Sequence, residues 1–144
     1  MIQQLSVFLE NRTGRLGQLT RALGDAKINM HALMVADTEQ FGVVRIIADE
    51  PHRAKEILDD MGFSATLTPV IAVEVPDRPG GLADVLEALG DAGLGIEYAY
   101  CFVEPQGECA VDVFKIDAPS AEQVLQESGF RVLVESDLYS LDVG

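Results

Sequence analysis

The two halves of this chain repeat each other at an offset of 66 residues, and this repeat limits the possible folds more than any other feature. The sequence Ala-Leu-Gly-Asp-Ala occurs at 22–26 and again at 88–92. Upstream, Asn11–Leu16 and Asp77–Leu82 carry Arg, Gly and Leu at matching places. Units of this length are typical of small two-layer domains rather than short solenoid repeats. The repeat therefore predicts two similar domains, residues 1–68 and 69–144.

The stretch Asp77–Leu82 joins an apolar run to a helical pattern and so predicts a strand-to-helix corner. Pro79 suits a first helical turn, and Gly80 and Gly81 have no Cβ to block approach to their backbone. The first N–H groups of a helix lack intrahelical partners and lie at the positive end of its dipole. An anionic group such as an amino-acid carboxylate could dock there. The alternative is that both corners only turn the chain.

Hydrophobic periodicity predicts the order strand, helix, strand, strand, helix, strand in each half, with an antiparallel sheet covered by two helices on one face. A capping box of Ser120 with Gln123 opens the last of these helices. Residues 66–70 form a short link between the halves, and residues 136–143 are left over to extend a sheet edge or pair with a partner. The expected strands are 5–9, 28–36, 41–48, 65–67, 70–76, 96–103, 109–116 and 131–134, and the expected helices are 16–26, 51–61, 82–92 and 120–125.

Charge and hydropathy limit the partners of the chain. The 24 Asp and Glu residues against 10 Lys and Arg give a net charge of −14, which repels phosphate backbones and anionic lipid. We therefore expect neither a nucleic acid nor a membrane as a partner. Without a leader-like start or a spanning apolar run, we expect a cytoplasmic protein. Each half alone buries little surface, which favours a homodimer.

The cysteines and histidines offer little support for catalysis. Cys101 and Cys109 flank a turn signal, so a tight hairpin could place them nearly opposite each other, either as a redox pair or as small apolar residues. His31 and His52 are the only histidines, and no motif for a nucleophile with its base, a metal or a phosphate loop occurs. The carboxylate of Asp112 is interpreted as part of a solvated acidic surface. We expect no enzyme activity and no cofactor.

The βαββαβ order, with Asp-Arg-Pro-Gly-Gly-Leu after the first strand and Ala-Gly-Leu-Gly-Ile-Glu before the second, resembles the ACT domain. The whole chain resembles a tandem pair of such domains. The resemblance implies a ferredoxin-like α+β fold in two copies with their sheets side by side. It also implies that an amino acid binds where the first corner of one module meets the second strand of its neighbour. The ligand-binding residues implied in this way are Asn11, Arg12, Thr13, Gly14, Arg15 and Leu16 with Ile96, Glu97 and Tyr98, and Asp77, Arg78, Pro79, Gly80, Gly81 and Leu82 with Met30, His31 and Ala32.

An amino-acid ligand suits these residue types. Its carboxylate needs helix-start amides, and its ammonium needs an acceptor such as Asn11 or Asp77. Arg12 and Arg78 have the simpler role of pairing with neighbouring carboxylates. The sequence thus favours an allosteric amino-acid sensor that acts on an amino-acid-metabolic enzyme. The alternative is an assembly or regulatory subunit that binds no ligand and dimerises through its sheets.

Overall fold

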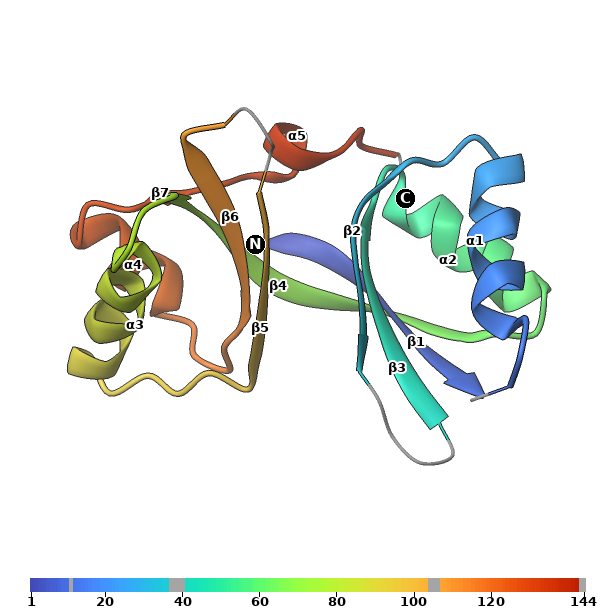
Figure 1. Ribbon diagram of the computed structural model, residues 1–144, viewed down its shortest axis with the longest axis horizontal. Coiled ribbons are helices and arrows are strands. Elements are labelled where there is room, and N and C mark those ends of the chain that lie inside the picture. The colour runs from blue at the N-terminus through green and yellow to red at the C-terminus, as the bar shows by residue number, and fades with distance from the viewer. Residues whose placement is uncertain (11, 37–40, 104–106, 143–144) are drawn as a thin grey trace. The chain divides into compact units, whose positions relative to one another are not determined.

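The computed structural model describes residues 1–10, 12–36, 41–103 and 107–142 (Figure 1). The chain divides into two compact units, and each is described by itself. The first unit contains residues 3–68 together with the C-terminal segment from residue 135 onward. The second unit contains residues 69–134 together with Met1 and Ile2. No helix within the described ranges is long and apolar enough to cross a membrane.

The first unit has a sheet in the order β2-β3-β1-β4. β3 pairs antiparallel with β1 and with β2, and Val44 of β3 lies opposite Val7 on one side and Val35 on the other. Residue Ser6 of β1 contacts Thr68 of β4 through their hydroxyl oxygens, 2.8 Å apart. The elements are β1 (Ile2–Glu10), α1 (Arg15–Asp25), β2 (Met30–Ala36), β3 (Phe41–Ala48), α2 (Pro51–Asp60) and the first part of β4 (Ser64–Pro76).

The second unit has a sheet in the order β7-β4-β6-β5. β6 pairs antiparallel with β4 and β5, and β7 pairs antiparallel with the other side of β4. The elements are the rest of β4, α3 (Gly81–Asp91), β5 (Tyr98–Val103), β6 (Cys109–Lys115), α4 (Ala121–Glu127) and β7 (Arg131–Val132). The mixed α/β class predicted from the sequence is confirmed.

Each unit has its own apolar core between its sheet and its two helices (Figure 1). In the first unit, Leu19 and Leu23 of α1 pack with Leu58 of α2 over the strands. In the second, Val85 and Leu89 occupy the same places on α3 that Leu19 and Leu23 occupy on α1. The repeated helical spacing of these apolar residues is the reason that both helices lie flat on their sheets.

Three local predictions are wrong. The separate strands expected at 65–67 and 70–76 are one strand, β4, which runs from Ser64 to Pro76 and joins the two units. Ser120 makes no side-chain cap on α4, and the Gln123 amide instead donates to Glu127 at 2.8 Å. Cys101 lies opposite Asp112 on β6 and not opposite Cys109, and both cysteines are free thiols.

Each end of the chain belongs to the unit formed by the other half of the sequence, which the repeat did not predict. Residues 136–143 were expected at a sheet edge or on a partner. The described part, residues 135–142, forms the short helix α5 (Glu135–Leu138) and a following segment that belong to the first unit, and Val143 lies outside the described residues. The amino group of Met1 pairs with Glu122 of the second unit at 2.8 Å, and Ile2 is fully buried.

Asp112 is buried, so its interpretation as a solvated surface residue is wrong. Asp112 is 4% exposed, and its Oδ2 has no hydrogen-bond partner. Asp112 lies opposite Val73 in the way that Val44 lies opposite Val7, so the repeat places a carboxyl where the first unit has a core valine. Burial raises the pKa of Asp112 above its ordinary value of 3.8.

We expect Asp112→Val to raise the free energy of unfolding at neutral pH by about 1–2 kcal/mol, since it removes a buried polar atom that has no partner. When folding raises the pKa of a carboxyl, the free energy of unfolding falls as the pH rises from the ordinary pKa to the folded pKa. The gain should therefore shrink as the pH falls from the folded pKa of Asp112 toward 3.8, and it should be smallest below about pH 4. Urea denaturation at neutral pH and below about pH 4 measures this gain in the free energy of unfolding.

Asp112→Asn is the matched control, because it keeps the size and polarity of the side chain but cannot ionise. Its free energy of unfolding should rise less than that of Asp112→Val, and it should lose the part of the pH dependence that comes from the Asp112 carboxyl. A lower stability of Asp112→Val than of the unaltered protein at neutral pH would contradict the interpretation that the carboxyl is a cost to folding.

Candidate functional site

The two glycine corners have the same backbone conformation. Gly14 before α1 has φ 89° and ψ −11°, and Gly80 before α3 has φ 86° and ψ −9°. Both values lie in the left-handed region, where glycine has no steric cost. In each corner the residue after the glycine donates a hydrogen bond from its N–H to the carbonyl oxygen three residues earlier. Arg15 donates to Arg12 in the first corner, and Gly81 donates to Arg78 in the second. The sequence repeat is therefore also a repeat of local geometry.

Neither helix has a side-chain hydrogen bond at its N-cap. The cap residue in each case is glycine, which has no side chain to accept from the first-turn N–H groups. Leu16 and Leu82, whose backbones carry first-turn amides, are both exposed. These amides lie at the positive ends of helices of 11 residues each. The arrangement suits a carboxylate from outside the chain.

The first helical residue differs between the corners. A Cβ on Gly81 would lie 2.4 Å from the carbonyl oxygen of Pro76, so this position accepts only glycine. Arg15 has the equivalent position in the first corner, and its guanidinium lies 4.2 Å from the centre of the Phe63 ring. The first corner thus leaves more room between helix and strand than the second.

The arginines of the corners pair with carboxylates of their own unit. Arg12 Nε lies 2.9 Å from Glu10, and Arg78 Nη2 lies 3.0 Å from Asp84. These side chains are largely exposed, so the pairs add little stability. The pairing was the simpler expectation from the sequence, and it is confirmed. A carboxylate docked at either corner would be bound mainly by backbone amides.

A cavity of about 290 Å³ adjoins the second corner. Arg78, Gly81 and Asp84 form one wall, while Glu74, Cys109 and Arg131 form another. Arg131 Nη1 lies 2.6 Å from Glu74, and Glu74 together with burial raises the pKa of the Cys109 thiol. Glu74 and Arg131 were not predicted as site residues, because neither belongs to the repeated corner motif.

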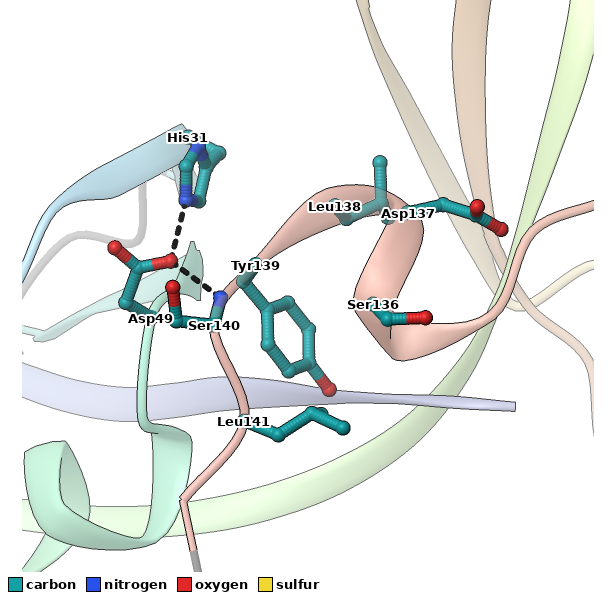
Figure 2. Close-up of a pocket in the computed structure, with 8 residues that line it drawn as sticks. All are labelled: His31, Asp49, Ser136, Asp137, Leu138, Tyr139, Ser140 and Leu141. Atoms are coloured by element: carbon teal, nitrogen blue, oxygen red, sulfur yellow. Dashed lines mark hydrogen bonds and ion pairs between the residues drawn. The ribbon is translucent and has the colours of Figure 1, made fainter.

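A second cavity, of about 610 Å³, lies at the start of β2 (Figure 2). His31 and Asp49 form one side, and residues 136–141 of the C-terminal segment form the other. His31 Nε2 lies 2.8 Å from Asp49 Oδ1. Hydrogen bonds from His31 and from the Ser140 amide outweigh the effect of burial and lower the pKa of Asp49. Asp49 was missed because it lies 18 residues from His31 and has no motif around it.

The other predicted binding residues are partly occupied within their own units. Met30 and Ile96 are half-buried and pack against the cores of the first and second unit, respectively. Glu97 lies 3.3 Å from Lys115. Ala32 and Tyr98 are half-buried in the edge strands β2 and β5. Of these residues, His31 is the one that lines a described cavity.

The predicted sites each combine residues of both units. Arg12–Leu16 and Met30–Ala32 lie in the first unit, and Asp77–Leu82 and Ile96–Tyr98 lie in the second. Asn11 lies outside the described residues. Among the residues that the structure describes, no group of three or more His, Cys, Asp or Glu side chains is placed to hold a metal ion.

Comparison with known proteins gives the family. The model of the ACT domain pair matches residues 1–142. None of the curated proteins compared with the chain matches it. The crystal structure of protein BT0572 from Bacteroides thetaiotaomicron is 37% identical, with a TM-score of 0.89 over 94% of this chain and 93% of that one.

Two further solved structures share the fold at low identity. The ligand-free regulatory subunit of aspartate kinase from Thermus thermophilus is 17% identical, with a TM-score of 0.65 over 88% of this chain and 92% of that one. The regulatory subunit of aspartate kinase from Thermus flavus is 20% identical, with a TM-score of 0.62 over 88% and 89%. The family match across residues 1–142 shows that the chain belongs to the ACT domain pair family.

Proposed function

We propose that this chain is a non-catalytic regulatory protein that binds a free amino acid at its glycine corners. In this proposal the two tandem ACT domains, expected at residues 1–68 and 69–144, have their antiparallel sheets side by side. Residues 135–142 belong to the first domain and not to the second. Each site combines the corner of one domain with the second strand of the other. One site takes residues 11–16 with 96–98, and the other takes residues 77–82 with 30–32.

The observation that carries this proposal is the matched geometry of the corners. Gly14 and Gly80 agree within 3° in φ, and each precedes a helix whose first-turn amides lack a side-chain cap. Glycine at these positions keeps the amides accessible, and the helix dipole favours a negative group there. An amino acid supplies such a group in its carboxylate. Asp77, which is exposed beside the second corner, would accept a hydrogen bond from the ammonium of the amino acid.

The proposed partner is an enzyme of amino-acid metabolism. Structures with the same fold are regulatory subunits of aspartate kinase, which supports a role in which ligand binding here changes the activity of another protein. A ligand transmits a signal only if it binds two conformational states with different affinity. We propose that the chain acts as a cytoplasmic homodimer in this role.

The edge strands support a second function, assembly without a ligand. Within the described strands, β2 pairs with β3 and β5 pairs with β6, each on one side. A strand at the edge of a sheet can pair with a strand of a partner. A protein that only assembles would dimerise through these edges and would gain no stability from an amino acid.

A thermal-shift screen of the free amino acids separates these two functions. A ligand that binds only the folded protein stabilises it by RT ln(1 + [L]/Kd), which is about 2.7 kcal/mol at a hundredfold excess over Kd. We expect one or a few amino acids to raise the melting temperature while the others do not. If no amino acid changes the melting temperature at millimolar concentration, the assembly function is the better account.

A further inference from the structure

The C-terminal strap, defined as residues 135–142, lies outside the βαββαβ repeat yet bonds to the first unit. Tyr139 is 4% exposed, and its hydroxyl accepts a hydrogen bond from the Gln3 amide at 2.9 Å. Burial raises the pKa of Tyr139 to about 12, so the hydroxyl stays neutral at physiological pH. The strap is thus anchored by a buried aromatic side chain.

The strap supplies the N-terminal cap that α2 lacks. Glu50, the residue before α2, has φ 47° and makes no side-chain cap. Asp142 Oδ2 instead accepts from the Arg53 amide at 2.7 Å, and its Oδ1 lies 3.2 Å from His52 Nδ1. A carboxylate on first-turn amides is favoured by the helix dipole. The helix therefore takes its cap from a residue 89 positions later in the chain.

The strap also fixes the carboxylate that orients His31. Asp49 Oδ1 accepts from the Ser140 amide at 2.7 Å and is the same oxygen that lies 2.8 Å from His31 Nε2 (Figure 2). The Ser140 carbonyl in turn accepts from the Glu50 amide at 2.8 Å. Two hydrogen bonds to one oxygen leave Asp49 little freedom, and the imidazole takes its orientation from it.

We infer that the strap is a detachable positioning element, which holds His31 for the bound amino acid and is itself held more tightly when the amino acid is bound. This inference rests on the proposed function, because His31 is one of the residues of the second proposed site. Coupling between two binding events is reciprocal, so a strap that improves ligand affinity must be stabilised by the ligand to the same extent. In this scheme Asp49 is a positioning residue between strap and imidazole.

The strap is partly exposed. Ser140 and Leu141 are exposed, and Tyr139 is the buried side chain among residues 135–142. Segments with few buried apolar contacts open locally at a lower free energy than the core. Release of the strap would remove both the Asp142 cap of α2 and the Ser140 hydrogen bond to Asp49.

The test uses the full chain with Asp142→Ala and a chain that ends after Val134. Asp91→Ala is the control, because it removes an equal charge from an exposed site on α3 in the second unit. Calorimetry with the amino acid found by the screen should show affinity reduced about tenfold in both strap variants and unchanged in the control. Hydrogen exchange of the Arg53 and Glu50 amides should be slow in the unaltered chain, slower still with ligand, and fast in the variants.

The outcomes separate this inference from the proposed function. An amino acid that binds the truncated chain as tightly as the unaltered one overturns the strap inference and leaves the proposed function in place. The strap inference is also overturned if the ligand does not slow hydrogen exchange at the Arg53 amide of the unaltered chain. An unaltered chain that binds no amino acid refutes the proposed function, and with it the coupling. His31→Gln should lower affinity without changing exchange at Arg53, which distinguishes positioning from loss of structure.

Discussion

Leu89→Ala should lower the free energy of unfolding by about 2–5 kcal/mol, the cost of emptying core volume that cannot collapse completely. Leu89 is fully buried in the core of the second unit between α3 and its sheet. Its side chain is among the largest of the fully buried ones. Urea denaturation followed by circular dichroism measures this loss.

Leu86→Ala on the same helix is the matched control. Leu86 is 39% exposed, so its truncation removes much less buried surface and should cost under about 1 kcal/mol. Equal losses from Leu86→Ala and Leu89→Ala would contradict the description of α3 as a helix that buries one face on the sheet of its own unit.

Gly81→Ala should destabilise the protein by about 3 kcal/mol, at the upper end of the usual cost of overpacking. The added Cβ would lie 2.4 Å from the Pro76 carbonyl oxygen and 3.3 Å from Val75 Cγ1. The nearest atom is backbone rather than the end of a flexible side chain, so the start of α3 must move away from β4. Thermal and urea denaturation measure the loss.

Gly90→Ala in the same helix tests whether the effect comes from the close approach or from glycine in a helix. A Cβ on Gly90 would meet no atom within 4 Å, and alanine has the higher helix propensity. This substitution should therefore raise stability by about 0.5–1 kcal/mol. A Gly81→Ala protein as stable as the unaltered chain would show that the corner is not closely packed.

The repeat and the hydrophobic periodicity predict β1–β3, β5–β7 and α1–α4, but neither the continuity of β4 nor the helix α5. The paired motifs fix where each helix starts, because glycine in the left-handed region cannot be replaced without cost. Leu82, Val85 and Leu89 recur at helical spacing, yet only Val85 and Leu89 of these three lie in the core, and Leu82 is 47% exposed. Periodicity identifies an apolar stripe, and the sheet beneath a short helix covers only part of it.

The features that the sequence did not predict depend on contacts between distant residues. Asp112 looks like any acidic residue of an acidic chain, and only strand register places it opposite the core residue Val73. Asp142 caps α2 across 89 residues, and Ser140 reaches Asp49 across 91. No local motif encodes such pairs, because each partner alone fits a solvated loop. The strap therefore had no place in a description built from the repeat.

Amino-acid binding at the glycine corners is the central claim, and isothermal titration calorimetry of a double variant tests it most directly. Gly14→Val with Gly80→Val places β-branched side chains at φ 89° and 86°, which distorts the corners and blocks approach to their amides. Gly62→Val with Gly93→Val is the matched control. These glycines also have positive φ, 86° and 74°, and follow the C-terminal ends of α2 and α3.

The proposal predicts that the unaltered chain and the Gly62→Val, Gly93→Val protein bind the amino acid with similar affinity, whereas the corner variant loses at least tenfold. Both double variants should melt at a lower temperature than the unaltered chain without ligand, because each forces two residues into a strained backbone region. Unchanged affinity in the Gly14→Val, Gly80→Val protein would contradict the claim and leave the two corners as structural turns.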